Sequence, residues 1–162
     1  MRRWFIILLW LTVAVAEATD LEIYFSPNGG CTNAIIDRLD KAADTVLVQA
    51  YSFTSPPIAK ALVDAKNRGV KVLILLDRGQ EKAKSSEWST VRDAGIKTKF
   101  DKKHAIAHNK VIIIDGITVI TGSFNFTRSA EFKNAENLVI INDKDVAKKY
   151  VENWEIHDAH SE

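Results

Sequence analysis

Four polar side chains able to act together lie in one short stretch of the sequence. His108 and Lys110 are two residues apart, and Ser123 and Asn125, directly after Gly122, have the same spacing. Residues two apart in an extended chain point to the same face, so each pair projects together. Between the pairs, Asp115-Gly116 is typical of a two-residue hairpin turn, which folds the second strand back onto the first. The sequence therefore predicts an imidazole, an ammonium, a hydroxyl and an amide at one spot.

This combination of groups suits a phosphodiester. Lysine and asparagine can donate hydrogen bonds to the non-bridging oxygens, while a histidine can attack phosphorus or move a proton. Each residue alone would more often be a solvated side chain near a strand end, so the combination carries the argument. No carboxylate cage surrounds the group, and no cofactor or metal is expected. His104 and His108 have a spacing that binds metals on a helix, but they precede a strand, which argues against a metal site.

The elements that must position these residues alternate along the chain. Strands are expected at 21–25, 45–53, 70–76, 96–100, 110–114, 117–121 and 138–141, and helices at 32–43, from Pro57 to Gly69, at 87–94 and at 143–154. Helices separate some strands and hairpins separate others. The predicted fold is therefore α/β, with a mixed β-sheet flanked by helices on both faces. His157 and His160, at the tail, are expected to be solvated.

The residues described so far resemble a known signature. His-x-Lys, four residues, Asp, six residues and Gly-Ser-x-Asn is the motif of the phospholipase D superfamily, and it is matched without a gap from His108 to Asn125. Similarity to the small secreted bacterial nucleases of that superfamily extends to the segments 50–54, 66–77, 121–127 and 134–137. The resemblance covers nearly the whole of residues 19–162 and implies a single phospholipase D-like domain.

The resemblance also implies roles for individual residues. In the family the motif histidine forms a phosphohistidine intermediate, a role that falls on His108. Lys110 and Asn125 match phosphate-binding positions, and Ser123 is a hydrogen-bonding neighbour. Glu136 matches the glutamate that orients the histidine in the nucleases. Asp115 lies at the hairpin turn, at the far end of the strand from His108, and is expected to be structural, as is Gly122.

A single copy of the motif has a further implication. Attack on phosphorus needs a second group to protonate the leaving oxygen, and the short nucleases supply it by forming a homodimer, with the active site on the two-fold axis. Two adjacent histidines do not readily both carry a charge, so the pair would share one proton. One His108 would then be the nucleophile and the other the acid.

The first eighteen residues have the layout of a secretory signal peptide. Arg2 and Arg3 precede an apolar stretch, 4–16, and small residues follow at Ala14, Ala16 and Ala18. The stretch is short for a membrane span of about 20 residues, but an uncleaved anchor is the alternative. Either way, a periplasmic or secreted location is expected. Cys31 is the only cysteine, so no disulfide can form within the chain.

The substrate is predicted less directly. Without residues 1–18 the chain has 20 basic and 20 acidic residues, so bulk charge does not indicate nucleic acid. Local charge does, because Lys102 and Lys103 precede His108 and Arg128 follows the motif. A non-specific endonuclease acting on DNA or RNA is the favoured function. One alternative is a phospholipase D-type hydrolase of lipid headgroups, for which no exposed apolar entry surface is evident. The other is a binding protein without catalytic activity.

Overall fold

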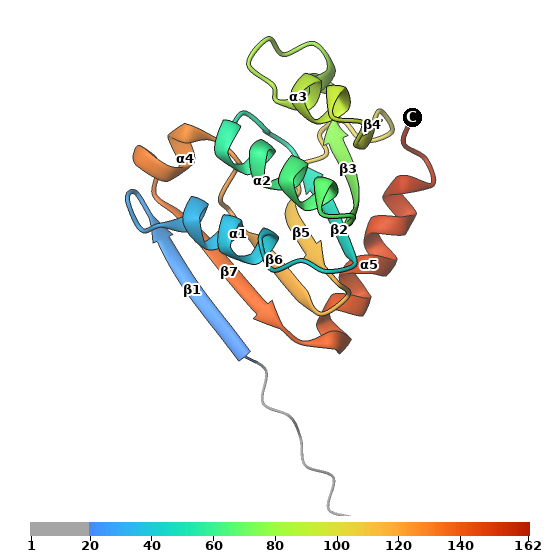
Figure 1. Cartoon of the computed structure of the whole chain (residues 1–162). Coiled ribbons are helices and arrows are strands. Elements are labelled where there is room, and N and C mark those ends of the chain that lie inside the picture. Colours follow the sequence, from blue (N-terminus) through green and yellow to red (C-terminus); the bar gives the residue numbers. More distant parts are fainter. Residues whose placement is uncertain (1–19) are drawn as a thin grey trace, which may run out of the picture.

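The computed structural model describes residues 20–162 (Figure 1), and the predicted signal segment lies outside these residues. The strands are β1 (Asp20–Ser26), β2 (Thr45–Ala50), β3 (Lys71–Asp77), β4 (Lys97–Asp101), β5 (Lys110–Ile114), β6 (Thr118–Gly122) and β7 (Glu136–Asn142). The helices are α1 (Cys31–Leu39), α2 (Pro56–Asn67), α3 (Trp88–Asp93), α4 (Arg128–Phe132) and α5 (Lys144–Asp158), with a 3₁₀ turn, η1, at Arg78–Glu81. Within the described residues, no helix is both long enough and apolar enough to cross a membrane.

The strands form one mixed sheet in the order β1-β7-β6-β5-β2-β3-β4. Strands β2, β3 and β4 run parallel, and their neighbours along the rest of the sheet pair antiparallel. Helix α2 connects β2 to β3, and η1 and α3 lie between β3 and β4, as parallel pairs need a crossover connection, whereas the antiparallel pair β5–β6 is joined by a hairpin. The predicted α/β class with a mixed sheet is confirmed.

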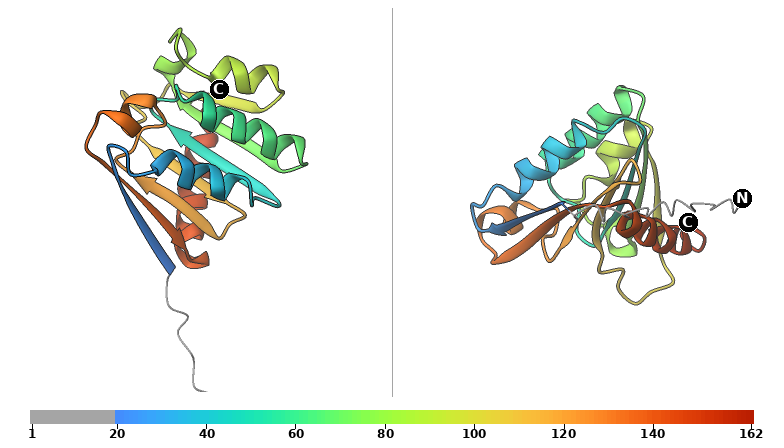
Figure 2. Two further views of the ribbon diagram at one scale, coloured as in Figure 1. Left: turned by 60° about the vertical axis from the view of Figure 1, so that its left-hand side comes forward. Right: turned by 90° about the horizontal axis from the view of Figure 1, so that it is seen from below.

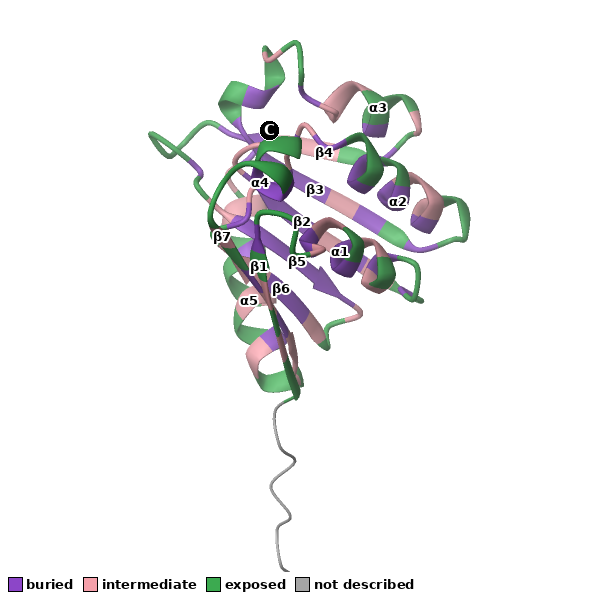
Figure 3. Ribbon diagram, turned by 90° about the vertical axis from the view of Figure 1, so that its left-hand side faces the viewer, coloured by how far each residue is buried: buried purple, intermediate pink, exposed green. Residues whose placement is uncertain are grey.

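Helices cover both faces of the sheet (Figures 1 and 2). Helices α1 and α2 pack their apolar stripes on one face, where the larger cluster of buried side chains includes the fully buried Cys31. On the other face α5 packs Ala147 and Trp154 against the central strands, and the Trp154 indole N–H donates to the Val48 carbonyl (3.1 Å). Buried residues therefore concentrate along the central strands (Figure 3), which holds their ends in fixed positions.

Several element bounds differ from the sequence prediction, among them the end of α1 at Leu39 and not at residue 43, and two of the differences lie near the motif residues. Strand β2 ends at Ala50 and not at Phe53, because the Phe53 N–H donates to the Gln80 side chain (3.1 Å) and the next N–H, that of Thr54, to the Phe126 carbonyl (2.9 Å). The short helix α4 was not predicted. Its N-cap is Thr127, whose hydroxyl accepts a hydrogen bond from the Ala130 N–H (3.1 Å).

The predicted hairpin between β5 and β6 is present, but three residues, Asp115 to Ile117, connect the strands and not the two that were predicted. Asp115 and Gly116 have positive φ angles of 54° and 63°, and the Ile117 N–H donates to the Ile114 carbonyl (3.0 Å). This is the geometry of a type I′ turn, which matches the twist of the flanking strands. Strand β6 begins at Thr118, one residue later than predicted, with Thr118 opposite Ile114.

Candidate active site

The motif residues meet at one edge of the sheet, the edge formed by the ends of the central strands and not by an outer strand. Strand β2 ends there at Ala50, directly opposite Lys110 at the start of β5. The hairpin register, Ile112 opposite Ile120, returns the end of β6 to the same edge, where Gly122 lies opposite Leu138 of β7. The sequence-predicted residues on both sides of the hairpin are therefore at the same end of neighbouring strands. This edge contains His108, Lys110, Ser123, Asn125 and Glu136.

Tyr51 supports the first pair of motif residues. The chain turns after β2 so that the Tyr51 N–H donates to the Asn109 carbonyl (2.8 Å), between the two motif residues. Its ring lies 4.6 Å from the His108 ring, centroid to centroid, and the Lys110 Nζ is 5.1 Å from the Tyr51 centroid. His108 is exposed, as a nucleophile needs to be. The neighbouring Tyr51 ring limits the orientations that the His108 imidazole can adopt.

Lys110 is buried for a lysine, with 7% of its surface exposed. Its ammonium donates to the His108 carbonyl (2.9 Å). Burial lowers the pKa of Lys110, while the negative charge of Glu136 acts in the opposite direction. The side chain thus presents a charge with little competing water, where an anionic oxygen would be strongly attracted.

The second half of the motif is held by Asn137. The Ser123 N–H donates to the Asn137 carbonyl and to its side-chain oxygen (both 3.1 Å), and the Asn137 N–H donates to the Ser123 hydroxyl (3.0 Å). Gly122 has a φ of +141°, and a Cβ there would lie 2.3 Å from the Asn137 carbonyl oxygen. Only glycine allows the backbones of these two neighbouring strands to approach this closely.

Asn125 is fixed by its neighbours. Phe124 and Phe126 are fully buried, and Phe126 forms a β-bridge with Phe53. Their alternation leaves Asn125 on the opposite side of the extended chain. The Asn125 Oδ1 is buried and has no hydrogen-bond partner within residues 20–162. The Oδ1 atom is an acceptor and cannot bind a phosphate oxygen, whereas the NH₂ group of Asn125 can donate to one.

Glu136 lies at the start of β7, half-buried. Its carboxylate accepts a hydrogen bond from the Asn134 side chain (2.9 Å), and its N–H donates to Ser26 (3.2 Å). No hydrogen bond joins it to His108 in the described part of the chain, so the predicted orienting contact is not formed here. The charge of Glu136 instead acts on Lys110.

Asp115 lies at the opposite end of β5. Its carboxylate accepts hydrogen bonds from three successive backbone N–H groups, those of Ala43 (2.9 Å), Asp44 (2.8 Å) and Thr45 (2.8 Å). Burial acts to raise the pKa of Asp115, but these donors outweigh it and the pKa is lowered. The contacts tie the hairpin turn to the start of β2.

The predicted substrate-binding cations are less closely grouped. Lys102 and Lys103 are exposed in the loop before His108, and the Lys102 ammonium lies 3.8 Å from Glu81 and 4.0 Å from Glu162. Arg128 begins α4 and packs over the Phe132 ring at 5.5 Å. It lines a cleft of about 690 Å³ between the starts of α1 and α2 and helix α4, which none of the motif residues lines.

Sequence reasoning missed four residues around the site. Tyr51 and Asn137 lie in segments that carried the family resemblance, but nothing local to them shows which residues they contact. Asp77 accepts from the Ala107 N–H (2.9 Å) and fixes the loop before His108. Asp101 gathers His104, His157 and His160, so the expectation that the two tail histidines are solvated is wrong.

Comparison with known proteins agrees with this geometry. A family profile described as "Cardiolipin synthase, PLD-like domain" matches residues 35–156, most of the chain. The chain belongs to the phospholipase D superfamily. The match spans both halves of the motif and the strands that position them.

Individual relatives of this phospholipase D-like chain are also close. It is 49% identical over 130 residues to a "Phospholipase D" of Rickettsia conorii, covering 80% of this chain and 65% of the relative, so the chain spans about two thirds of that protein's length. It is 30% identical to "Mitochondrial cardiolipin hydrolase" of Xenopus laevis, covering 85% and 70%. The solved structure of Nuc, a phospholipase D family member from Salmonella typhimurium, superposes with a TM-score of 0.85 at 38% identity. That match covers 90% of this chain and 97% of Nuc.

Proposed function

We propose that the protein is a phosphodiesterase in which His108 is the nucleophile and no metal takes part in the chemistry. The observation that carries this proposal is the meeting of exposed His108, buried Lys110 and the Ser123–Asn125 turn at one sheet edge. An imidazole nitrogen of His108 attacks phosphorus and the bond to the leaving oxygen breaks. Lys110 and Asn125 hold the non-bridging oxygens. Water then attacks the phosphohistidine and releases the histidine.

The leaving oxygen needs a proton, and the proposal takes it from His108 of a second copy of the chain. Two exposed imidazoles facing each other across a two-fold axis would share one proton, so that one attacks while the other donates. The donor then accepts a proton from the attacking water. The proposed active unit is therefore a homodimer, with Lys110 and Asn125 from each copy around the phosphate.

The proposed substrate is nucleic acid, cleaved without base specificity. The match to Nuc, at 38% identity and with a TM-score of 0.85, is in keeping with the resemblance to the small nucleases of the superfamily. The exposed Lys103 lies in the same loop as His108, where it can contact a phosphate backbone. We propose a periplasmic or secreted location from the layout of residues 1–18.

Substitution at the two central residues tests the chemistry. His108→Ala and Lys110→Met are expected to lower the rate of DNA or RNA cleavage by at least about a thousandfold, because nucleophile and charge stabilisation are lost. Lys149→Met, at an exposed lysine of α5, is the matched control and should retain the wild-type rate. Residual activity of His108→Ala above about one tenth would contradict the mechanism.

Mixed dimers test the two-copy site. Wild-type and His108→Ala chains carrying different tags are co-expressed, and the heterodimer is purified on both tags. It is expected to have under about 1% of wild-type activity, because one histidine cannot be both nucleophile and acid. A heterodimer with half the wild-type activity would show that each chain works alone.

The second candidate function is hydrolysis of phospholipid headgroups. Three alternating residues of the edge strand β1, Leu21, Ile23 and Phe25, expose 53%, 58% and 65% of their surface, and Ile106 in the His108 loop exposes 57%. The structure thus exposes apolar side chains on β1 and in the His108 loop that the sequence analysis did not identify. Incubation with DNA, with RNA and with cardiolipin vesicles, each with and without chelator, separates the functions. Release of headgroups with no nucleic-acid cleavage would favour phospholipid hydrolysis as the function.

A further inference from the structure

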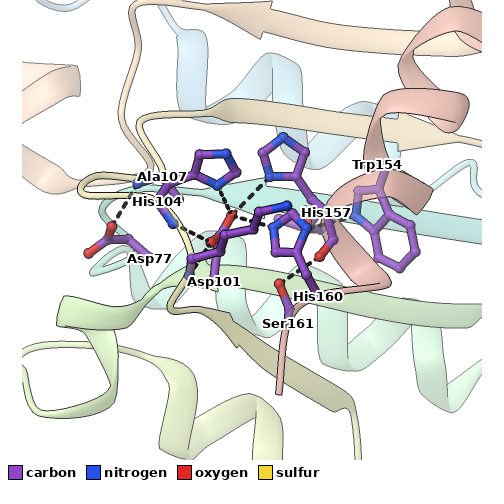
Figure 4. Close-up of polar contacts among 10 residues, drawn as sticks. Asp77, Asp101, His104, Ala107, Trp154, His157, His160 and Ser161 are labelled. Carbon is purple, nitrogen blue, oxygen red and sulfur yellow. Dashed lines mark hydrogen bonds and ion pairs between the residues drawn. The ribbon is translucent and has the colours of Figure 1, made fainter.

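Four side chains of the types that can ligate a metal meet away from the motif residues. Asp101 ends β4, His104 follows in the next loop, His157 lies in the last turns of α5 and His160 comes just after that helix (Figure 4). The Asp101 Oδ2 lies 2.8 Å from His104 Nδ1, 2.9 Å from His157 Nδ1 and 3.3 Å from His160 Nε2. All four ligand atoms lie within 4.8 Å of one another.

More nitrogen groups point at the Asp101 carboxylate than its lone pairs can accept hydrogen bonds from. One carboxylate oxygen has two lone pairs, yet three imidazole nitrogens point at the Asp101 Oδ2. The other oxygen, Oδ1, already accepts from the Lys103 and His104 N–H groups (both 3.1 Å). A cation between the four groups would instead take one lone pair from each, which is the arrangement that the converging atoms fit.

We propose that Asp101, His104, His157 and His160 form a structural zinc site. Zinc favours four-coordinate tetrahedral sites with nitrogen and oxygen ligands at about 2.0–2.1 Å, which places neighbouring ligand atoms about 3.3 Å apart. The distances at Oδ2 are within about 0.5 Å of that value. All four positions are filled by the protein, so the metal has no open position for substrate and is not catalytic.

Burial agrees with a closed site that keeps one entry. The side chains of Asp101, His157 and His160 are 2%, 14% and 17% exposed, whereas His104 is 44% exposed. A buried carboxylate is expensive unless it is paired with positive charge. The metal can enter past His104, after which that side chain closes the site.

The position of the site suggests what the metal does. Asp101 and His157 are 56 residues apart, and the tail already pairs with β4 through the Phe100 N–H to Glu162 carbonyl bond (2.7 Å) and the reciprocal bond (3.2 Å). The metal would fasten α5 to the start of the loop that contains His108. The far end of that loop is held by Asp77 through the Ala107 N–H.

The test measures metal binding and stability on the purified full chain after removal of metal with chelator. We expect one zinc per chain by elemental analysis after dialysis. With free zinc at about a hundredfold over Kd, the unfolding temperature should rise by about 5–10 °C. Cobalt in place of zinc should give the visible absorption of a four-coordinate site.

Two variants at the cluster and one control make the result specific. His160→Ala, in the tail, and His104→Ala, at the exposed side, should each weaken zinc binding by at least about a hundredfold and abolish the thermal shift. His108→Ala should bind zinc like the wild-type chain, because His108 is outside the cluster. No bound zinc in the wild-type chain, or unchanged binding in both cluster variants, would overturn the proposal. These readouts do not depend on catalysis.

Discussion

The replacement Asp115→Asn tests whether the motif aspartate is structural. Asparagine also adopts the left-handed backbone found here, where φ is 54°, so the change does not strain the turn. It keeps one oxygen that can accept from Asp44 and Thr45. It places an NH₂ group where the Asp115 Oδ2 now accepts from the Ala43 N–H. One charge-assisted hydrogen bond is lost and two are weakened.

The magnitude follows from these contacts. A hydrogen bond to a charged group contributes about 1.5–3 kcal/mol, and the lower part of the range applies because the Ala43 and Asp44 bonds are exposed to water. We expect the free energy of unfolding at pH 7 to fall by about 2 kcal/mol and the unfolding temperature by about 4–8 °C. The cleavage rate of the folded variant should stay within about twofold of wild type, since Asp115 is at the far end of β5 from Lys110.

The pH dependence gives a second readout. The pKa of Asp115 is lowered from its ordinary value of 3.8, so the folded protein binds this proton less tightly than the unfolded chain. The stabilisation is therefore complete above about pH 5 and is lost as the pH falls through the folded-state pKa. The difference between wild type and variant should be constant from about pH 8 to 5 and shrink below about pH 4.

Urea unfolding followed by circular dichroism at a series of pH values measures both effects. Asp37→Asn, at an exposed aspartate of α1, is the control and should change stability by less than about 0.5 kcal/mol. The reasoning is refuted if Asp115→Asn is as stable as wild type at pH 7, or if its deficit persists undiminished at pH 3.5. Loss of activity in fully folded Asp115→Asn would point to a catalytic role instead.

Two further changes probe the active site itself. Gly122→Ala is expected to destabilise the protein by about 1–3 kcal/mol and to lower activity at least tenfold, since its Cβ would lie 2.3 Å from the Asn137 carbonyl oxygen; thermal unfolding and initial rates check this. Glu136→Gln removes the charge that raises the pKa of Lys110, so the alkaline fall in activity should move to lower pH. A pH–rate profile measures this shift. The control Glu152→Gln, on the outside of α5, should leave the profile unchanged. An unmoved alkaline limb in Glu136→Gln would contradict the assignment.

Local sequence determined much of this protein. Asp115-Gly116 makes the turn by itself, because both residues accept positive φ. The register did not follow from the turn alone, since Ile117 is an extra residue and Thr118 lies opposite Ile114. The two-residue spacing within each motif pair follows from the strand period. The mixed sheet could likewise be predicted from where helices and hairpins separate the strands, and the structure confirms it.

The contacts that complete the site depended on tertiary structure. Tyr51 reaches His108 because β2 pairs with β5, and Asn137 holds Ser123 because β7 pairs with β6. Tertiary structure also decides the contacts of the Glu136 carboxylate, which accepts a hydrogen bond from Asn134 and whose charge raises the pKa of Lys110. Strand order is decided by how the whole set of apolar faces packs, and no local pattern encodes it.

The histidine cluster shows the difference most clearly. His157 lies in the last turn of α5 and His160 just after it, and the sequence there gives no sign of a partner, while Asp101 and His104 belong to a strand end and loop 56 residues earlier. They meet because α5 packs across the central strands through Trp154, which carries the tail to the edge of β4. Spacing along the chain could therefore predict the His108 motif, but only packing could bring these four side chains together.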